Sequence, residues 1–363
     1  MIEPMPDAGS PAPDDLAVSV RPDEDYDAVV VVSFGGPEGP DEVMPFLENV
    51  TRGRDVPRER LEEVAEQYLT TSGGVSPINE QNRALVEALQ RELSDHGIDL
   101  PVYWGNRNWQ PFLTDTVAQM ADDGVERSLA FVTSAYSSYS GCRQYREDIE
   151  TARAEVGGRA PVIDKIRQFW NHPGFIEPFR EGLTAALDRL DPDQREQTRL
   201  VFTAHSLPLS MAATSDYQTQ LDDAVALVAE VAPELERDLV WQSRSGPPQV
   251  PWLEPDICDH LRALADDGID TVVVVPIGFV SDHQEVRFDL DTQAAEVADE
   301  LAMTFLRVPT PGTHPGFVTM VRELITERLD PTAPRRALGT LGPRSDTCAM
   351  DCCPPPQRPR GAA

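Results

Sequence analysis

The stretch Leu200-Val201-Phe202-Thr203-Ala204-His205-Ser206-Leu207-Pro208 places a histidine directly after an apolar run that is typical of a strand. A second stretch, Val280-Ser281-Asp282-His283-Gln284-Glu285-Val286, places a glutamate at the start of a helical pattern, downstream of the apolar run Thr271–Val275. In parallel α/β sheets, ligands bind outside the carboxyl ends of the strands. We therefore expect His205 and Glu285 to face a shared cleft, although a single histidine is often only a packed or surface residue. An imidazole and a carboxylate together can accept protons and hold a divalent metal.

Strand and helix patterns alternate from residue 27 onward, which favours parallel sheets covered by helices. The expected strands are 28–33, 102–106, 128–133, 162–163, 200–203, 239–242 and 271–275. Because the two halves of the chain repeat this scheme, we predict an α/β fold of two Rossmann-like lobes, each a parallel four-stranded sheet flanked by helices, with a cleft between them. The predicted division is a disordered acidic leader at 1–26, an N-terminal lobe at 27–165, a C-terminal lobe at 166–330 and a Pro/Arg-rich tail at 331–363.

The bulk composition limits the possible partners. The 363 residues carry a formal net charge of −31, and a nucleic-acid backbone needs a basic face, so nucleic acid is not an expected partner. No apolar run approaches the roughly 18 residues of a membrane span, and the N-terminus lacks the basic and apolar segments of a signal peptide. We therefore expect a soluble cytoplasmic protein, without a membrane span, whose charge lies mostly on a solvated surface.

Several further segments combine with the two opening stretches into a specific pattern. These segments are Ser33–Glu38, Gly73–Ile78, Gln242-Ser243 with Pro251–Leu253, and Gly278–Glu285. In this order and spacing they resemble the ferrochelatase family, and in particular its actinobacterial members, over nearly all of residues 27–328. The resemblance implies a metal chelatase, a lyase, that inserts Fe²⁺ into a porphyrin and releases two protons. It implies coproporphyrin III as the substrate and Fe-coproporphyrin (coproheme) as the product in haem biosynthesis, with protoporphyrin IX as the close alternative.

The resemblance also implies roles for the histidine and the glutamate. His205 matches the histidine of the family motif and Glu285 its partner carboxylate, and together they would hold Fe²⁺ loosely before it passes to the pyrrole nitrogens. A histidine near its unperturbed pKa can accept the protons that the porphyrin releases at neutral pH. Counting by fours along a helix from Glu285 gives Asp289 and Gln293, and Gln293 departs from the acidic series that the family suggests.

Four residues are predicted to contact the porphyrin. Arg54 is a candidate clamp for a propionate, because a guanidinium binds a carboxylate through two hydrogen bonds. Ser76 and Tyr145 lie in segments that line the porphyrin pocket of the family. Phe34 occupies a position where some members carry a tyrosine that ligates the product iron, and a phenylalanine cannot do so. The sequence leaves open which group, if any, replaces that ligand.

The five cysteines suggest a second site. An odd number in a chain without a secretory signal argues against a disulfide framework, and three of them, Cys348, Cys352 and Cys353, are clustered in the tail. Some ferrochelatases hold a 2Fe–2S cluster with one internal and three C-terminal cysteines, and Cys142 lies in the segment that matches the internal ligand. A zinc site or free thiols remain alternatives. The Pro-rich tail is otherwise expected to have little that fixes it to the body of the protein, and Cys258 is expected to be an ordinary packed thiol.

Other functions with the same fold remain possible. One is a related chelatase that inserts cobalt or nickel into another tetrapyrrole, against which the histidine–glutamate pairing speaks. Another is a non-catalytic haem or iron–sulfur sensor, which the intact His205 and Glu285 disfavour. The expected partners are the porphyrin and other enzymes of the haem pathway.

Overall fold

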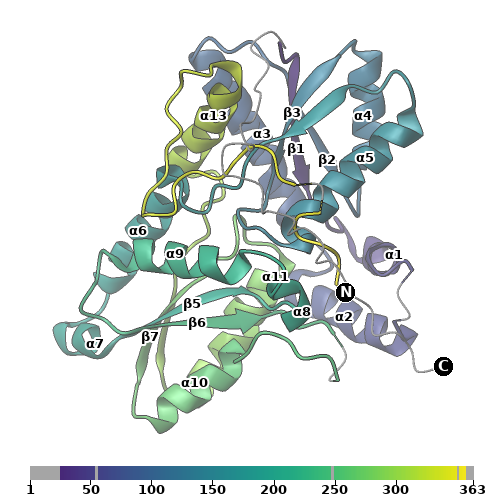
Figure 1. Ribbon diagram of the computed structural model, residues 1–363. Helices are drawn as coiled ribbons and strands as arrows, with labels where there is room; N and C mark the ends of the chain where they lie inside the picture. Colours follow the sequence, from purple (N-terminus) through teal and green to yellow (C-terminus); the bar gives the residue numbers. More distant parts are fainter. Residues whose placement is uncertain (1–24, 54–55, 247–248, 350, 357–363) are drawn as a thin grey trace, which may run out of the picture.

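Two four-stranded parallel sheets, each flanked by helices, form the framework of the protein and confirm the predicted fold class (Figure 1). The computed structural model describes residues 25–53, 56–246, 249–349 and 351–356. Arg54 and residues 1–24 of the expected leader therefore lie outside the described residues. Tyr26, at the end of the expected leader, is buried, and its hydroxyl donates to Asp164 at 3.0 Å.

The two sheets have the same strand order, so the second half of the chain repeats the topology of the first. The first sheet has the order β2-β1-β3-β4, and the second has the order β6-β5-β7-β8. The strands are β1 (Ala28–Ser33), β2 (Val102–Asn106), β3 (Arg127–Val132), β4 (Val162–Lys165), β5 (Arg199–His205), β6 (Arg237–Gln242), β7 (Thr271–Val275) and β8 (Thr304–Arg307). Chain order thus places β1 and β5 at the same interior position of their sheets.

Helices cover both faces of each sheet, which explains why the interior strands are apolar throughout. The α-helices are α1 (Pro40–Val50), α2 (Arg58–Ser72), α3 (Ile78–Asp95), α4 (Leu113–Asp122), α5 (Gln144–Val156), α6 (Pro173–Leu187), α7 (Pro192–Gln197), α8 (Leu209–Ala212), α9 (Tyr217–Ala229), α10 (Ile257–Asp266), α11 (Gln284–Val286), α12 (Ala295–Glu300) and α13 (Pro315–Leu329). Two segments are π-helical, η2 (Tyr139–Arg143) and η3 (Arg287–Ala294). Among the described residues, no helix is both long and apolar enough to cross a bilayer.

One apolar core joins the two sheets. Alternate residues of β1, such as Val29 and Val31, pack in the same cluster as Phe202 of β5 and Val273 of β7. The opposite faces of the sheets pack in separate clusters, one beneath α4 and α5 and the other beneath α10 and α12. The last helix, α13, returns to the first lobe, where Arg322 donates to Glu92 of α3 at 2.8 Å (Figure 1).

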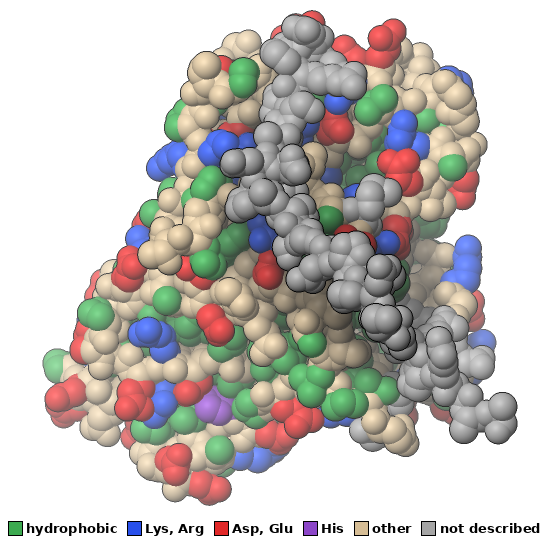
Figure 2. Space-filling model, in the orientation of Figure 1, with side chains coloured by type: hydrophobic (Ala, Val, Ile, Leu, Met, Phe, Trp, Pro, Cys, Tyr) green, Lys and Arg blue, Asp and Glu red, His purple; other side chains and the backbone are tan. Residues whose placement is uncertain are grey.

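Acidic side chains are spread over the face drawn in Figure 2 rather than gathered at one place. On the face drawn in Figure 2, Asp and Glu side chains are scattered among Lys and Arg side chains over both lobes. Many of the ion pairs have exposed partners, as between Arg262 and Asp259 at 3.1 Å. Such pairs contribute little to stability, and the charge serves mainly to keep the surface solvated.

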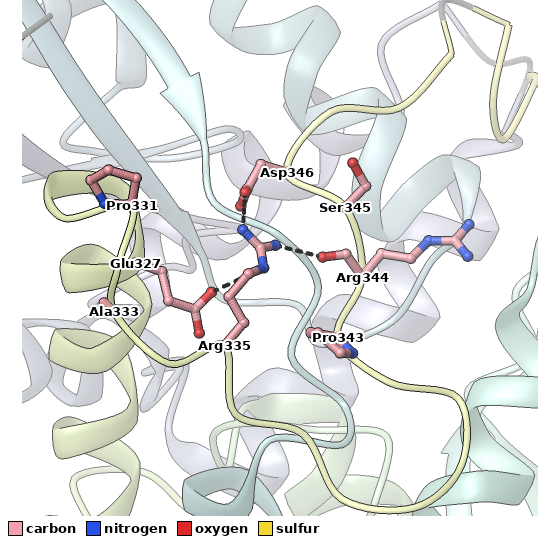
Figure 3. Close-up of a pocket in the computed structure, with 8 residues that line it drawn as sticks. All are labelled: Glu327, Pro331, Ala333, Arg335, Pro343, Arg344, Ser345 and Asp346. Carbon is pink, nitrogen blue, oxygen red and sulfur yellow. Dashed lines mark hydrogen bonds and ion pairs between the residues drawn. The ribbon is translucent and has the colours of Figure 1, made fainter. Parts of the chain in front are cut away.

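The segment 331–346, which we call the strap, is held to the second lobe by several contacts, so the expectation that little would fix the tail was wrong. Arg335 pairs with Asp346 and donates to the carbonyl of Arg344 at 2.8 Å, within a small pocket beside α13 (Figure 3). Asn171 exchanges hydrogen bonds with the backbone of Leu338 and also donates to the carbonyl of Gly342 at 2.9 Å. The amino-acid composition of the strap does not predict these contacts, because most of them involve backbone groups of the strap.

A buried ion pair fixes the start of the strap and supports a stability prediction. Arg167 donates to both carboxylate oxygens of Glu327, at 2.7 and 2.8 Å, and the two side chains are 0% and 1% exposed. Glu327→Gln removes the charge at nearly constant volume and leaves Arg167 buried without an opposite charge. We expect the free energy of unfolding in urea to fall by about 3–5 kcal/mol.

The exposed pair Arg262–Asp259 provides the matched control for that measurement. Its side chains are 53% and 76% exposed, so Asp259→Asn should change the free energy of unfolding by less than about 1 kcal/mol. Equal effects of the two substitutions would contradict a special contribution from the buried pair.

Candidate active site

His205 and the turn that carries Glu285 meet at the carboxyl edge of the second sheet. His205 is the last residue of β5, and Glu285 lies in α11 after the turn that follows β7, the parallel neighbour of β5. Gly278 makes the close approach possible, because a Cβ at this position would lie 2.7 Å from the Cα of Ala204. Its N–H also donates to the carbonyl of Thr203 at 3.0 Å. The structure thus brings together the two residues that the sequence singles out.

The two side chains face each other with their reactive atoms accessible. His205 Nε2 lies 3.8 Å from Glu285 Oε1, and the side chains are 31% and 49% exposed. His205 Nδ1 lies 2.5 Å from the carbonyl oxygen of Ser206, which can only accept, so Nδ1 carries the proton of that hydrogen bond. In the neutral imidazole, Nε2 therefore keeps its lone pair, which is directed to the Glu285 side and is available to a proton or a metal ion.

Each member of the pair favours the charged form of the other. Burial lowers the pKa of His205, but the Glu285 carboxylate and the Ser206 carbonyl outweigh it, and the net pKa is raised above the usual 6.5. Burial raises the pKa of Glu285, but His205 and His283 outweigh it and lower that pKa to about 2. Glu285 is therefore a carboxylate across the physiological range, and it favours the protonated form of His205.

His283 holds the start of α11 in place. Its Nδ1 accepts from the N–H of Glu285 at 3.2 Å, which caps the start of α11. The ring also packs against the edge of Phe279, with centroids 5.1 Å apart. Burial lowers the pKa of His283, which keeps the ring neutral and able to accept this hydrogen bond.

A second carboxyl group lies next to the pair and has an unusually high pKa. Asp289 accepts from Ser243 Oγ and from Gln242 Nε2, and burial together with the nearby Glu285 raises its pKa to about 7. The sequence indicated Gln242 and Ser243 only through the family resemblance, and their hydrogen bonds with Asp289 were not predicted. The α-helix expected from residue 286 is a π-helix over η3, a form that occurs frequently at functional sites. Gln293, at the outer end of η3, is exposed.

The predicted porphyrin residues that the structure describes all lie in the first lobe. Phe34 follows β1, is 37% exposed and packs edge-on against Phe46. Ser76 is only 3% exposed and lies against Gly36, where a Cβ would come within 2.7 Å of Ser76 Oγ. Tyr145 is buried beneath the guanidinium of Arg107, 3.7 Å from the ring centroid. Burial raises the pKa of Tyr68 on α2, and the nearby Glu285 carboxylate raises it further.

The four cysteines of the predicted cluster site are neighbours, although Cys142 is far from the other three in the sequence. Cys142 lies in η2. Burial raises the pKa of Cys353 to about 12, with smaller contributions from the thiols of Cys142, Cys352 and Cys348. Cys348 shares a thiol hydrogen bond with Cys352, and the pKa of Cys348 is raised chiefly by burial. None of the five cysteines forms a disulfide. Cys258 lies on α10, apart from this group.

The group offers four sulfur donors with two arginines beside them, and burial keeps Cys348 and Cys353 as neutral thiols in this structure. Arg146 Nη1 lies 3.5 Å from Cys352 Sγ, and Arg143 donates to the Cys352 carbonyl at 3.1 Å. Four thiolates are the usual ligands of an iron–sulfur cluster, and cations nearby offset their charge. In the described part of the chain, which omits residue 350, no three His, Cys, Asp or Glu side chains are close enough together to hold one metal ion. The four thiols are therefore neighbours, but they do not surround one common point in this structure.

The electrostatics of the pair support a prediction about the pKa of His205. Glu285→Gln removes the carboxylate that opposes the effect of burial, so the pKa of His205 should fall below its wild-type value. The imidazolium would then lose its proton at lower pH than in the wild type. Titration of the histidine ring signals by NMR measures this shift, and the signals of His96 and His314, at the ends of other elements, serve as internal controls. An unchanged pKa would show that Glu285 does not act on His205.

Comparisons with known proteins identify the family of the chain. The family model described as Ferrochelatase matches residues 26–329. The coproporphyrin III ferrochelatase of Nocardia farcinica is 56% identical over 93% of this chain and 99% of its own length, and that of Streptomyces coelicolor is 49% identical over 93% and 96%. A ferrochelatase of Rhodopirellula baltica is 53% identical over 90% and 93%.

The fold is also shared with a solved chelatase structure. SirB from Bacillus subtilis, determined with Fe³⁺, superimposes with a TM-score of 0.53 at 14% identity, covering 83% of this chain and 96% of SirB. At this identity the likeness concerns the fold alone. The family match, by contrast, covers most of the chain, and the relatives exceed 45% identity over nearly their whole lengths. The chain belongs to the ferrochelatase family.

Proposed function

We propose that this ferrochelatase inserts Fe²⁺ into coproporphyrin III and releases Fe-coproporphyrin for haem biosynthesis, in the cytoplasm. The observation that carries the metal chemistry is the accessible His205–Glu285 pair at the edge of the second sheet. The choice of porphyrin is supported by relatives named coproporphyrin III ferrochelatase, which match this chain along nearly its whole length. Cysteines without disulfides fit a reducing compartment.

The reaction exchanges two pyrrole protons for one Fe²⁺ ion, so the site must supply both a base and a temporary metal ligand. Once Fe²⁺ has passed to the pyrrole nitrogens, the freed lone pair of His205 Nε2 would take the two pyrrole protons one after the other, and the Glu285 carboxylate would stabilise the imidazolium that forms each time. Imidazole and carboxylate are both suitable ligands for Fe²⁺, and two such groups alone bind it weakly enough for transfer to four nitrogens. Asp289, with a pKa of about 7, can accept a proton next and pass it toward solvent.

The first lobe would bind the macrocycle. Ser76 and Tyr145 are proposed to hydrogen-bond propionates and Arg54 to pair with one. Phe34 would pack against the porphyrin face without ligating iron, so the product lacks a protein ligand from this position. Because residue 34 makes no bond to the iron of Fe-coproporphyrin, the product is held less tightly and is released more readily.

Substitution of the base tests the proposal directly. We expect His205→Ala to slow Fe²⁺ insertion by at least about a hundredfold, the usual contribution of a general base, while porphyrin binding persists. The assay follows Fe²⁺ insertion into coproporphyrin III and protoporphyrin IX without oxygen. His260→Ala is the control, since His260 pairs with Asp238 near the start of β6, whereas His205 ends β5. Near-normal turnover of His205→Ala would exclude the assignment, and a preference for protoporphyrin IX would exclude coproporphyrin III.

We further propose that Cys142, Cys348, Cys352 and Cys353 bind a 2Fe–2S cluster. The support is that four free thiols from distant segments are neighbours and that Arg143 and Arg146 lie beside them. The cluster would supply a covalent link between η2 and the tail. No step of metal insertion passes through it.

Thiol substitutions test the cluster. Protein purified without oxygen should be red-brown and contain the iron and inorganic sulfide of one cluster per chain. Cys142→Ser should remove the colour, the iron and the sulfide, whereas Cys258→Ser should leave all three unchanged. Colourless wild-type protein with zinc at these thiols would overturn the proposal, as would colour retained by Cys142→Ser.

A further inference from the structure

Gln81 connects the two lobes through a reciprocal pair of hydrogen bonds. Its Nε2 donates to the backbone carbonyl of Asp282 at 2.9 Å, and its Oε1 accepts from the backbone N–H of Asp282 at 2.9 Å. Gln81 lies in the first turn of α3, whereas Asp282 lies three residues before Glu285. One amide side chain thus satisfies both backbone groups of a residue that has no strand or helix partner.

On the first-lobe side, the start of α3 is tied to the loop that follows β1. The N–H of Ser76 donates to the carbonyl of Pro37 at 2.8 Å, and Asn79 donates to the carbonyl of Gly36 at 3.1 Å. This loop begins at Phe34. Gln81 is therefore attached to the same rigid unit that carries two of the proposed porphyrin contacts, Phe34 and Ser76.

On the second-lobe side, Asp282 is tied to Glu285. The Asp282 carboxylate accepts from Arg307, at 3.1 and 3.2 Å, and from Thr310 at 2.9 Å. The next residue, His283, caps α11 by accepting from the N–H of Glu285. A displacement of Asp282 would therefore be transmitted to Glu285 over a segment of three residues.

We infer that Gln81 is a positioning residue that fixes Glu285 relative to the porphyrin-facing loop of the first lobe. The inference rests on the proposed role of Glu285 as a metal ligand. Without the two hydrogen bonds, the turn before α11 loses its attachment to the first lobe, and the metal is no longer held at a fixed place above the macrocycle. Porphyrin binding should be unaffected, because the contacts of α3 with Pro37 and Gly36 do not involve Gln81.

The same helix provides a matched control. Gln90, also half-buried on α3, makes an equivalent reciprocal pair within the first lobe: it donates to the carbonyl of Leu100 at 3.2 Å and accepts from the N–H of Val102 at 2.9 Å. Gln81→Met and Gln90→Met each remove two such bonds at nearly constant volume. Gln81→Glu keeps the acceptor but loses the donor, and gives a milder second variant.

The experiment measures kcat and the KM values for Fe²⁺ and coproporphyrin III, together with the dissociation constants of Fe²⁺ by anaerobic calorimetry and of the porphyrin by fluorescence. Gln81→Met should lower kcat/KM for Fe²⁺ roughly tenfold and weaken Fe²⁺ binding, with porphyrin binding unchanged within about twofold. Gln81→Glu should be intermediate. Gln90→Met should lower the unfolding temperature to a similar extent but leave both substrates' constants unchanged.

Two outcomes would overturn the inference. One is a Gln81→Met protein that loses stability like Gln90→Met but keeps wild-type Fe²⁺ constants, which would make the contact merely structural. The other is an equal loss of Fe²⁺ and porphyrin binding, which would show that Gln81 shapes the porphyrin wall. Failure of the proposed function is recognised separately, because wild-type protein would then not insert Fe²⁺, while calorimetry would still report the effect of Gln81 on metal binding.

Discussion

Parallel pairing of β5 with β7 is the constraint on which the site depends. Parallel neighbours end at the same edge of a sheet, so the residue that ends β5 and the turn that follows β7 must meet there. Gly278 then allows the turn to pass against Ala204, and His283 starts the short helix that presents Glu285. The pairing of β1 with β3 has the same consequence in the first lobe, where the loop from Phe34 faces the proposed substrate.

The electrostatic design of the site favours transfer over storage. His205 and Glu285 stabilise each other's charged forms, so the pair survives partial burial without a resident ion. In the proposed role, one imidazole and one carboxylate would hold a divalent ion only weakly, which suits an ion that must move on. The nearby Glu285 carboxylate contributes to the raised pKa of Asp289, and this raised pKa makes Asp289 a proton acceptor rather than a permanent anion. The thiol group near η2 is a different environment, built from burial and nearby arginines.

The sequence predicted those parts of the molecule that depend on local pattern. The strands 28–33, 102–106 and 271–275 were predicted to the residue, because continuous apolar runs have few alternatives. The strand β8 was missed, since it is a half-buried edge strand of four residues with little apolar signal. Residues 287–294 were expected to form an α-helix but form the π-helix η3, because hydrophobic periodicity in the sequence does not distinguish these two kinds of helix. Contacts of side chains with distant backbone, such as those of Gln81 and Asn171, have no sequence signature at all.

The apolar core that both sheets share determines how the protein responds to denaturation. Separating the lobes would expose the inner faces of β1 and β5 to water, at a cost of about 25 cal/mol for each Å² of apolar surface. Neither lobe can therefore melt while the other stays native, and the chain forms a single cooperative unit despite its internal repeat. A ligand that binds the native first lobe would then also raise the free energy of global unfolding of the second lobe.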